Sequence, residues 1–471
     1  MAPEQIEVDK IETLEQAVSL IKVLIGEIVT LRSRVTSLEE ENARLRKNSS
    51  NSSKPPSSDI VKPEEQRRQP GKRKSGGQPG HEGKSRALFP PEMVDTVDER
   101  TLSECPSCQG SLEKQADEQS IIHQVAELRQ QPLEITEYRR HCYWCESCQK
   151  THYGELPDGV DPLQICGPRL QALLAYMKGN FGASYSALQQ FCAEVLSLPI
   201  SLGALGKVIK RVSQALAVPC NELALEVPKQ ELLHIDETGW SDKGKRLWVW
   251  IFCNPVFAYF TIQPSRGCKV LRQILGETFS GAIVSDFYGA YVKYANPRQQ
   301  FCLAHLIRDI KFLATHPNAD TAKCATKLLV YFRRLFKLWH SRSTLSDEEL
   351  QQKCKRLRRK LFTFLHSPEI APGCNTLKKR LVKHWESLFL FVSEPHLIQP
   401  TNNHAERNLR QLVKLRRLSQ GSRSVWGQLW AARIMTTLQT CRLQNKSPWN
   451  FLNQAITAKL LKSQPPSLVI P

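Results

Sequence analysis

What the 471-residue sequence lacks is the first guide to its function. It contains no run of about 18 apolar residues, so no segment is suited to cross a bilayer as a helix. The amino-terminal stretch MAPEQIEVDK has neither the basic start nor the apolar centre of a secretory signal peptide. We therefore expect a cytoplasmic protein with no membrane partner.

Acidic residues are also scarce, because 46 Asp and Glu stand against 65 Lys and Arg and leave a formal net charge of +19. A protein this basic commonly binds a polyanion, above all DNA or RNA, although a generally basic surface is the alternative. Cysteine is not scarce. The 15 Cys are an odd number and are scattered except for one cluster. In a reducing cytosol, this distribution favours free thiols and a metal site over a disulfide framework.

Residues 7–46 carry a heptad repeat and are predicted to form a coiled coil. The a positions are Leu14, Ile21, Ile28, Val35 and Asn42, and the d positions are Ala17, Leu24, Leu31, Leu38 and Leu45. β-branched residues at a with Leu at d favour a parallel two-stranded coil, and a single Asn at a fixes its register. The facing charges would be Glu27 with Arg32, Arg34 with Glu39, and Glu41 with Arg46. A single amphipathic helix packed on its own domain is the alternative.

Residues 47–100 are predicted to be a basic disordered linker. Stretches such as NSSNSSKPPSSD and GKRKSGGQPGHEGKSR cannot bury a core. Lys72, Arg73 and Lys74 are candidates for contacts to DNA phosphate that do not depend on base sequence. A linker that is merely solvated is the alternative.

Residues 101–160 are predicted to form a zinc-binding domain. Cys105 and Cys108 lie in ECPSCQG, and Cys142, Cys145 and Cys148 lie in HCYWCESCQKTH. Two CxxC pairs supply four thiolates, a set that binds one structural Zn²⁺ tetrahedrally. We expect Cys105, Cys108, Cys145 and Cys148 to be the ligands. Cys142 and Cys145 have the same spacing, however, so Cys142 stays open as a ligand, and His141 and His152 could substitute.

Residues 168–227 are predicted to be helical. A helix, a short turn and a second helix resemble a helix-turn-helix that binds DNA, although any helical bundle would give a similar pattern. Ser201 is a candidate N-cap of the second helix. The basic residues on that helix are Lys207, Lys210 and Arg211.

The pattern changes to strands in residues 228–425. The apolar run in ELLHIDETGW ends at Asp236, two further β-rich runs and a helix follow, and the apolar run in GAIVSDFYGAY ends at Asp286. Three strands, a helix and then strands alternating with helices predict a ribonuclease-H-like α/β catalytic core. The first and fourth strands of that fold are neighbours. We therefore expect Asp236 and Asp286 to lie side by side, where a metal can bridge them.

A third carboxylate is expected downstream, and Glu406 in TNNHAERNLR lies near the start of a basic helix. Two divalent ions about 3.5–4 Å apart activate the attacking oxygen and stabilise the leaving oxygen when a phosphodiester is broken. Oxygen ligands suit Mg²⁺ or Mn²⁺. The alternative is that these are ordinary acids that cap a strand or pair with a cation. The basic residues expected to contact DNA phosphate beside Glu406 are Arg407, Arg410, Lys414, Arg416 and Arg417.

A helical insertion is expected within this core at about residues 318–395, and a helical segment at 426–471. Residues 321–390 hold sixteen Lys or Arg and five Asp or Glu. The insertion is therefore either a solvated basic surface or a lobe that faces DNA, and we favour the second.

These motifs together resemble the transposases of insertion sequence family 66, a bacterial DDE group, along nearly the whole chain. The resemblance rests on NSSKPPSSD, GGQPGHEGKSR, the two CxxC pairs, HIDETGW, VSDFYGAY, CLAHLIRD, and TNNHAERNLR followed by LRRLSQGSRSVWG. It implies a leucine zipper, a zinc-binding domain, a DDE core with a helical insertion, and a small carboxy-terminal segment. By motif match, the metal triad falls on Asp236, Asp286 and Glu406. Cys142 is an addition to the family pattern.

The resemblance implies an enzyme that cleaves DNA at transposon ends and uses the freed 3′-hydroxyl to attack target DNA. One metal site can serve both in-line displacements. The partners would be end and target DNA, further copies of the chain, and helper proteins of the same element; the protein would be associated with the nucleoid. A nuclease that does not join DNA is one alternative, which the zipper and insertion disfavour. A non-enzymatic DNA-binding protein is the other, which the intact triad disfavours.

The heptad predicts that the protein is dimeric at micromolar concentration without DNA. Replacing Leu24 and Leu31 with Lys should give monomers that still bind zinc, because the d-position contacts are lost. Replacing Asn42 with Leu should tighten association and extend it to higher oligomers. Light scattering tests both variants. An intact protein that is monomeric, or a double-Lys variant that stays dimeric, would show that the zipper is not the dimer contact.

Overall fold

The computed structural model describes residues 13–45, 87–100, 102, 105–111, 122–129, 131–161 and 164–470. Contacts divide the chain into one unit of residues 65–138 and a second unit that holds the remainder. Lys72, Arg73 and Lys74 lie outside the described residues, as does Arg46 of the predicted zipper. No described helix is both long and apolar enough to cross a membrane.

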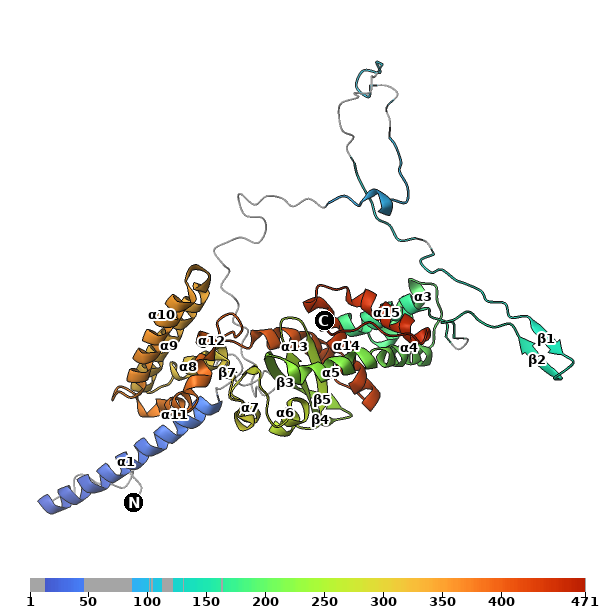
Figure 1. Cartoon of the computed structure of the whole chain (residues 1–471). Coiled ribbons are helices and arrows are strands. Elements are labelled where there is room, and N and C mark those ends of the chain that lie inside the picture. The colour runs from blue at the N-terminus through green and yellow to red at the C-terminus, as the bar shows by residue number, and fades with distance from the viewer. Residues whose placement is uncertain are drawn as a thin grey trace. The chain divides into compact units, whose positions relative to one another are not determined.

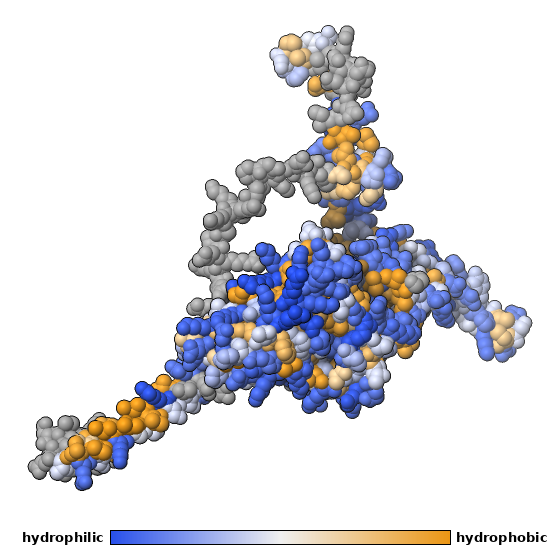
Figure 2. Space-filling model, turned by 60° about the vertical axis from the view of Figure 1, so that its left-hand side comes forward, coloured by the Kyte–Doolittle hydropathy of each residue, from blue (hydrophilic) through white to orange (hydrophobic). Residues whose placement is uncertain are grey.

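Helix α1 (Leu14–Leu45) occupies most of the segment that the heptad predicts to be helical. Its apolar side chains are exposed, including Ile21 at 54%, Leu31 at 61% and Val35 at 52%. Figure 2 shows orange, hydrophobic residues along this helix. A second helix in a coiled coil would bury such residues. The dimer itself stays a prediction.

Two short strands lie near the start of the second stretch of the larger unit, residues 139–471. Strand β1 (Cys142–Cys145) pairs antiparallel with β2 (Lys150–Tyr153), and Cys145 lies opposite Lys150. The turn between them holds Cys148. The other short described element before the core is the 3₁₀ helix η4 (Pro91–Met93) in the smaller unit.

The predicted helical segment contains four α-helices and a π-helical turn. They are α2 (Pro168–Tyr176), the π-helix η5 (Met177–Phe181), α3 (Tyr185–Glu194), α4 (Leu202–Ala215) and α5 (Ala217–Glu226). Ser201 caps α4 as predicted, because its hydroxyl accepts a hydrogen bond from the Ala204 amide at 3.2 Å. One face of α4 is buried against α2, α14 (Val425–Leu443) and α15 (Pro448–Leu460).

A mixed five-stranded sheet lies at the centre of the core, in the order β5-β4-β3-β6-β7 (Figure 1). The strands are β3 (Leu232–Asp242), β4 (Lys245–Cys253), β5 (Ala258–Gln263), β6 (Ala282–Ser285) and β7 (Gln299–Phe301). The first three are antiparallel neighbours, whereas β6 runs parallel to both β3 and β7. The first and fourth strands of this sheet are therefore adjacent, as the sequence predicts.

The composition of the strands explains their burial. The β4 segment LWVWIFC is rich in aromatic and β-branched residues, which favour strands. Trp250, Phe252 and Phe260 are among the largest fully buried side chains of the described residues. The short strand β6 is buried at every position, as expected for a strand inside a sheet covered on both faces.

Helices connect and cover the strands. They are α6 (Cys268–Leu275), α7 (Gly289–Tyr294) and α8 (Leu303–Leu313), then α9 (Ala319–His340), α10 (Asp347–Leu365), α11 (Asn375–Lys383) and α12 (Trp385–Ser393) in the region of the predicted insertion, and finally α13 (Asn403–Ser419), α14 and α15. The 3₁₀ helices of this region are η6 (Val227–Lys229), η7 (Arg342–Thr344) and η8 (Pro372–Cys374).

Helix α14 covers the edge strand β5 with side-chain hydrogen bonds. The Thr436 hydroxyl accepts from the Phe260 amide at 3.0 Å, and the Thr440 hydroxyl accepts from the Ala258 amide at 3.1 Å. An uncovered edge strand would leave such amides free to pair with another chain. Because α15 packs on α2, the helices before and after the sheet belong to one body with it.

Candidate active site

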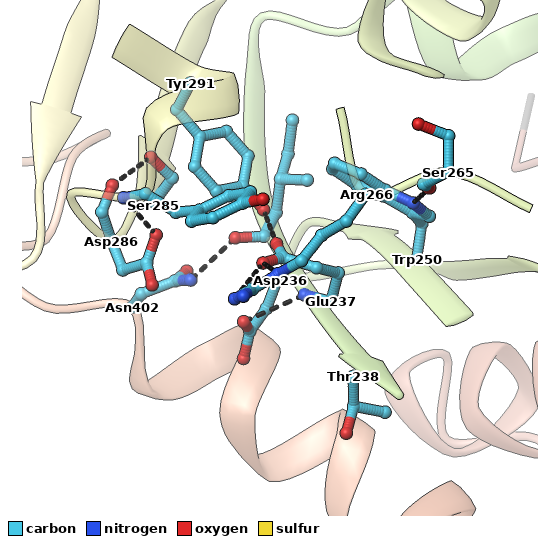
Figure 3. Close-up of polar contacts among 12 residues, drawn as sticks. Asp236, Glu237, Thr238, Trp250, Ser265, Arg266, Ser285, Asp286, Tyr291 and Asn402 are labelled. Carbon is cyan, nitrogen blue, oxygen red and sulfur yellow. Dashed lines mark hydrogen bonds and ion pairs between the residues drawn. The ribbon is translucent and has the colours of Figure 1, made fainter. Parts of the chain in front are cut away.

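Two of the three carboxylates chosen from the sequence meet at one edge of the sheet. Asp236 lies within β3, and Asp286 immediately follows β6. The parallel register pairs His234 with Val284. Continuing that register by two residues places Asp236 opposite Asp286. Figure 3 shows both side chains at this edge of the sheet, close to Asn402.

The third carboxylate, Glu406, lies in the first turn of α13. Its charge is close enough to raise the pKa of both Asp236 and Asp286, so the structure brings the three predicted carboxylates into one electrostatic cluster. The Glu406 Oε1 atom is buried and has no hydrogen-bond partner. The Arg308 guanidinium and the His305 Nε2 atom each lie 3.7 Å away. Burial, followed by the charge of Arg308, lowers the pKa of His305 to about 4, so its imidazole is neutral near pH 7.

Burial and repulsion from neighbouring carboxylates disfavour the charged forms of Asp236 and Asp286. Removal from water, followed by the charges of Glu237 and Glu406, raises the pKa of Asp286 to about 7, although a hydrogen bond from the Tyr288 amide and the charge of Arg266 act in the opposite direction. The pKa of Asp236 is raised well above its ordinary value, first by burial and then by Glu237 and Asp286. A divalent cation would relieve this repulsion, and oxygen donors suit Mg²⁺ or Mn²⁺. The residues present therefore fit such an ion.

Asn402, which sequence reasoning missed, ties together the elements that carry the site. Its side-chain amide donates to the Ile235 carbonyl at 2.8 Å, and its side-chain oxygen accepts from His234 Nδ1 at 3.2 Å. Its backbone amide donates to the Cys302 sulfur at 3.2 Å. The Cys302 amide in turn donates to the Ser285 carbonyl at 2.7 Å, next to Asp286. Asn402 is 1% exposed, so water does not compete for these bonds.

A second group of residues missed from the sequence surrounds Glu237, which directly follows Asp236. Glu237 is buried and pairs with the Arg266 guanidinium at 2.7 Å, and the Tyr291 hydroxyl donates to its other oxygen. Arg266 also lies over the Tyr288 ring, 3.7 Å from its centre. Figure 3 shows Arg266 and Tyr291 converging on Glu237 beside Asp236. Because Tyr288 and Tyr291 follow Asp286, this network joins the two aspartate-bearing segments.

The sequence held only a partial signal for these two groups. Asn402 and Glu237 lie inside the motifs TNNHAERNLR and HIDETGW. These motifs were selected for Glu406 and Asp236, and not for Asn402 or Glu237. Arg266 lies outside those motifs, in the loop between β5 and α6, and its partner Glu237 is on β3.

The basic residues predicted on α13 fall into two groups. Arg407, Arg410, Lys414 and Arg417 are exposed, and their spacing places them on one face of the helix. Arg416 is half-buried instead and donates to the Thr238 hydroxyl at 2.9 Å and to the Gly239 carbonyl, so it ties α13 to β3.

The basic residues predicted on α4 divide similarly. Lys207 and Lys210 are exposed, and the Lys210 ammonium lies 4.5 Å from the centre of the Trp426 ring. Arg211 is half-buried and donates to the Gln164 side chain at 2.9 Å. Its guanidinium is therefore already engaged within the protein.

The CxxC segments adopt similar local conformations at Cys105–Cys108 and Cys145–Cys148. Hydrogen bonds from the backbone amides of the third and fourth residues lower the pKa of the first Cys in each pair. The residue after each pair, Gln109 or Gln149, is left-handed, with φ of 59° and 51°. Such turns present both sulfurs to one side and stabilise thiolate, so they fit Zn²⁺.

The alternative pair, Cys142 with Cys145, does not form a turn. Both residues lie in the extended strand β1, where Cys142 is opposite Tyr153. This geometry favours Cys148 over Cys142 as the partner of Cys145. His152 remains close, because its Nε2 atom lies 3.4 Å from the Cys148 sulfur.

A mixed α/β core with clustered carboxylates beside a basic helix is the arrangement expected of metal-dependent enzymes that act on nucleic-acid phosphates. Comparison with known families then supplies the particular assignment. The family described as "Transposase IS66 family" matches residues 164–429, more than half of the chain. The chain therefore belongs to the IS66 family of transposases, as the resemblance of its motifs predicted, and DNA is the partner that this family implies.

Further similarities cover other parts of the chain. Residues 5–87 match a family of unknown function, DUF6444. The chain is 24% identical over 418 residues to the uncharacterized protein y4hP of Sinorhizobium fredii, covering 78% of this chain and 73% of that protein. It is 26% identical over 246 residues to the uncharacterized protein y4qI of the same organism, covering 46% of this chain and 44% of that protein.

The raised pKa of Asp286 predicts a pH-dependent stability in buffer free of Mg²⁺ and Mn²⁺. Between the ordinary pKa of 3.8 and about 7, the folded protein holds more protons at this site than the unfolded chain, so stability falls as pH rises through that window. Replacing Asp286 with Asn should therefore stabilise the metal-free protein by about 1–3 kcal/mol at pH 8, allowing for screening by solvent, and change little near pH 4.

Urea unfolding of both proteins at the two pH values measures this difference. The variant Glu231→Gln, at an exposed position beside β3, is the matched control and should show no such pH dependence. Equal effects of Asp286→Asn at pH 4 and pH 8 would contradict the electrostatic explanation.

Proposed function

We propose that this protein is a DDE transposase that cleaves transposon ends and joins the freed 3′-hydroxyls to target DNA. The observation that carries the proposal is that Asp236 on β3, Asp286 after β6 and Glu406 on α13 are close enough for their charges to interact, beside the exposed basic face of α13. In this proposal, residues 228–425 are a ribonuclease-H-like catalytic domain with a helical insertion. Residues 7–46 are the dimer contact, and residues 101–160 are a zinc-binding domain.

The three carboxylates would hold two Mg²⁺ or Mn²⁺ ions. When bound, such ions lower the barrier to attack of an oxygen nucleophile on the phosphate and stabilise the oxygen that leaves. In cleavage, a water oxygen would form the new bond to phosphorus and the 3′-oxygen would leave. In joining, that 3′-hydroxyl would attack a target phosphate and displace a target 3′-oxygen. The number of phosphodiester bonds is conserved in the joining step.

The other residues of the site would position DNA and the carboxylates. Arg407, Arg410, Lys414 and Arg417 form a continuous basic face that starts next to Glu406, and such side chains commonly contact DNA phosphates. Asn402 would hold the start of α13 against β3, and the Glu237–Arg266 pair would hold the segment after β6. A metal site depends on such supporting contacts as well as on its ligands.

The catalytic proposal predicts that Asp236→Asn, Asp286→Asn and Glu406→Gln each lower nicking and joining by at least about a hundredfold. The reason is that each variant removes a metal ligand, a larger change than loss of a supporting contact. DNA binding should change little, because the basic residues remain. The assay uses the full chain, Mg²⁺ or Mn²⁺, and labelled DNA from the ends of its own element. Asp320→Asn, an exposed residue on α9, is the control variant.

Three outcomes of that assay are informative. Normal cleavage by one of the three variants would remove that residue from the proposed triad. Cleavage without joining would assign a nuclease instead. DNA binding without either activity, with or without the substitutions, would favour a non-enzymatic DNA-binding protein.

We further propose that Cys105, Cys108, Cys145 and Cys148 hold one structural Zn²⁺. Replacing Cys105 or Cys148 with Ser should remove one equivalent of zinc and destabilise residues 100–155, because a small metal domain folds around its ion. Cys142→Ser should keep the zinc, since Cys142 lies in a strand rather than in a turn. Elemental analysis and limited proteolysis measure both effects. Zinc loss from Cys142→Ser but not from Cys148→Ser would reverse the assignment.

A further inference from the structure

A second cluster of metal-ligand side chains lies beside the carboxylates. Cys302, His305 and Glu406 each offer one ligand atom, and these atoms lie within 4.8 Å of one another. Cys302 is fully buried, and the side chains of His305 and Glu406 are 14% and 27% exposed. The only member of this cluster with a role in the proposed function is Glu406.

Local structure accounts for the way this cluster forms. Cys302 is the N-cap of α8, and His305 lies in the first turn of that helix, so the spacing CxxH places sulfur and imidazole next to each other. The Cys302 sulfur accepts the Asn402 amide at the start of α13, which brings the first turn of that helix and Glu406 to the same place. Burial raises the pKa of the Cys302 thiol to about 11, although hydrogen bonds from the backbone amides of Asn402, His305 and Ala304 act in the opposite direction. A metal ion bound to this sulfur would displace the thiol proton.

An unsatisfied buried oxygen is a second and independent indication of a ligand. Glu406 Oε1 is buried without a hydrogen-bond partner, and the Arg308 guanidinium stays 3.7 Å away from it. The distance from Glu406 Oε1 to His305 Nε2 is 3.7 Å. That is too long for a hydrogen bond, but it is close to the separation of about 3.4 Å between two ligand atoms that each lie about 2.1 Å from a tetrahedral ion.

The chemistry of the donors differs from that of the carboxylate triad. One sulfur, one imidazole nitrogen and one carboxylate oxygen suit Zn²⁺, whereas a thiol is a poor ligand for Mg²⁺. Three protein ligands leave a fourth position open for water. Bonding all three to one ion would draw the Glu406 carboxylate toward Cys302 and His305, because the most separated ligand atoms must approach each other.

We propose that Cys302, His305 and Glu406 form a Zn²⁺ site that shares Glu406 with the triad, so that Zn²⁺ inhibits the Mg²⁺-dependent reaction. This inference rests on the proposed function for its effect on catalysis, but not for the existence of the site. Binding of Zn²⁺ there is reversible and distinct from binding to the CxxC pairs. It provides a way in which a free transition-metal ion could stop DNA cleavage without unfolding the protein.

The first test measures zinc binding by the full chain without DNA. Equilibrium dialysis should show one more equivalent for the native protein than for Cys302→Ser or His305→Gln, while the zinc of the CxxC pairs is unaffected. Cys268→Ser, a partly exposed cysteine at the start of α6, is the control and should keep the extra equivalent. Circular dichroism shows whether each variant is folded. Equal stoichiometry in the native protein and both folded variants would overturn the proposal.

The second test measures inhibition as a ratio, so that basal activity cancels. At fixed Mg²⁺, the Zn²⁺ concentration that halves DNA nicking should rise at least about tenfold in Cys302→Ser and in His305→Gln, and stay unchanged in Cys268→Ser. An unchanged inhibitory concentration in the first two variants would overturn the regulatory role. A protein that binds the extra equivalent but never cleaves DNA would instead count against the proposed function, leaving the zinc site in place.

Discussion

A chain of hydrogen bonds through Asn402 and Cys302 holds the candidate site together. It runs from the Ile235 carbonyl to the Asn402 side chain, from the Asn402 amide to the Cys302 sulfur, and from the Cys302 amide to the Ser285 carbonyl. Each of these contacts joins segments that are far apart in the sequence. Because the groups are buried, the loss of one partner would leave another unsatisfied, which is costly in a protein interior. The relative placement of the three carboxylates depends on this chain.

Electrostatic repulsion among the clustered carboxylates acts against these stabilising hydrogen bonds. Four carboxylates, those of Asp236, Glu237, Asp286 and Glu406, influence one another at the edge of the sheet, and burial adds to the cost of ionising Asp236 and Asp286. Glu237 is paired closely with Arg266 and Tyr291. The charged forms of Asp236 and Asp286 are destabilised in the absence of a cation. This is a common feature of functional sites, where stability is lower than the fold alone would allow.

The position of Glu406 links the different properties of the site. It follows the Asn402 cap, starts a helix whose exposed face is basic, and lies within 3.7 Å of both His305 and Arg308. In the two proposals above, Glu406 is shared between a set of oxygen ligands and a mixed set with an imidazole and a thiol. The two sets prefer different metals.

The sequence alone determined the family, the neighbouring positions of β3 and β6, and the Ser201 cap, whereas the metal-binding role of Asp236, Asp286 and Glu406 stays a prediction. These features depend on local patterns: apolar runs that end in Asp, a capping residue before a helix, and contiguous motifs. Tertiary structure alone decided that Asn402 joins the start of α13 to β3 and to Cys302, and that Arg416 binds β3 rather than facing solvent. It also decided that the Thr436 and Thr440 hydroxyls cover the edge of β5. It also distinguished Cys148 from Cys142, which have the same spacing to Cys145. Cys148 lies in a turn, whereas Cys142 lies in a strand. The physical reason is that burial and hydrogen bonding depend on which distant segments pack together. The sequence around a side chain carries no periodic or compositional sign of the distant residue that it will contact.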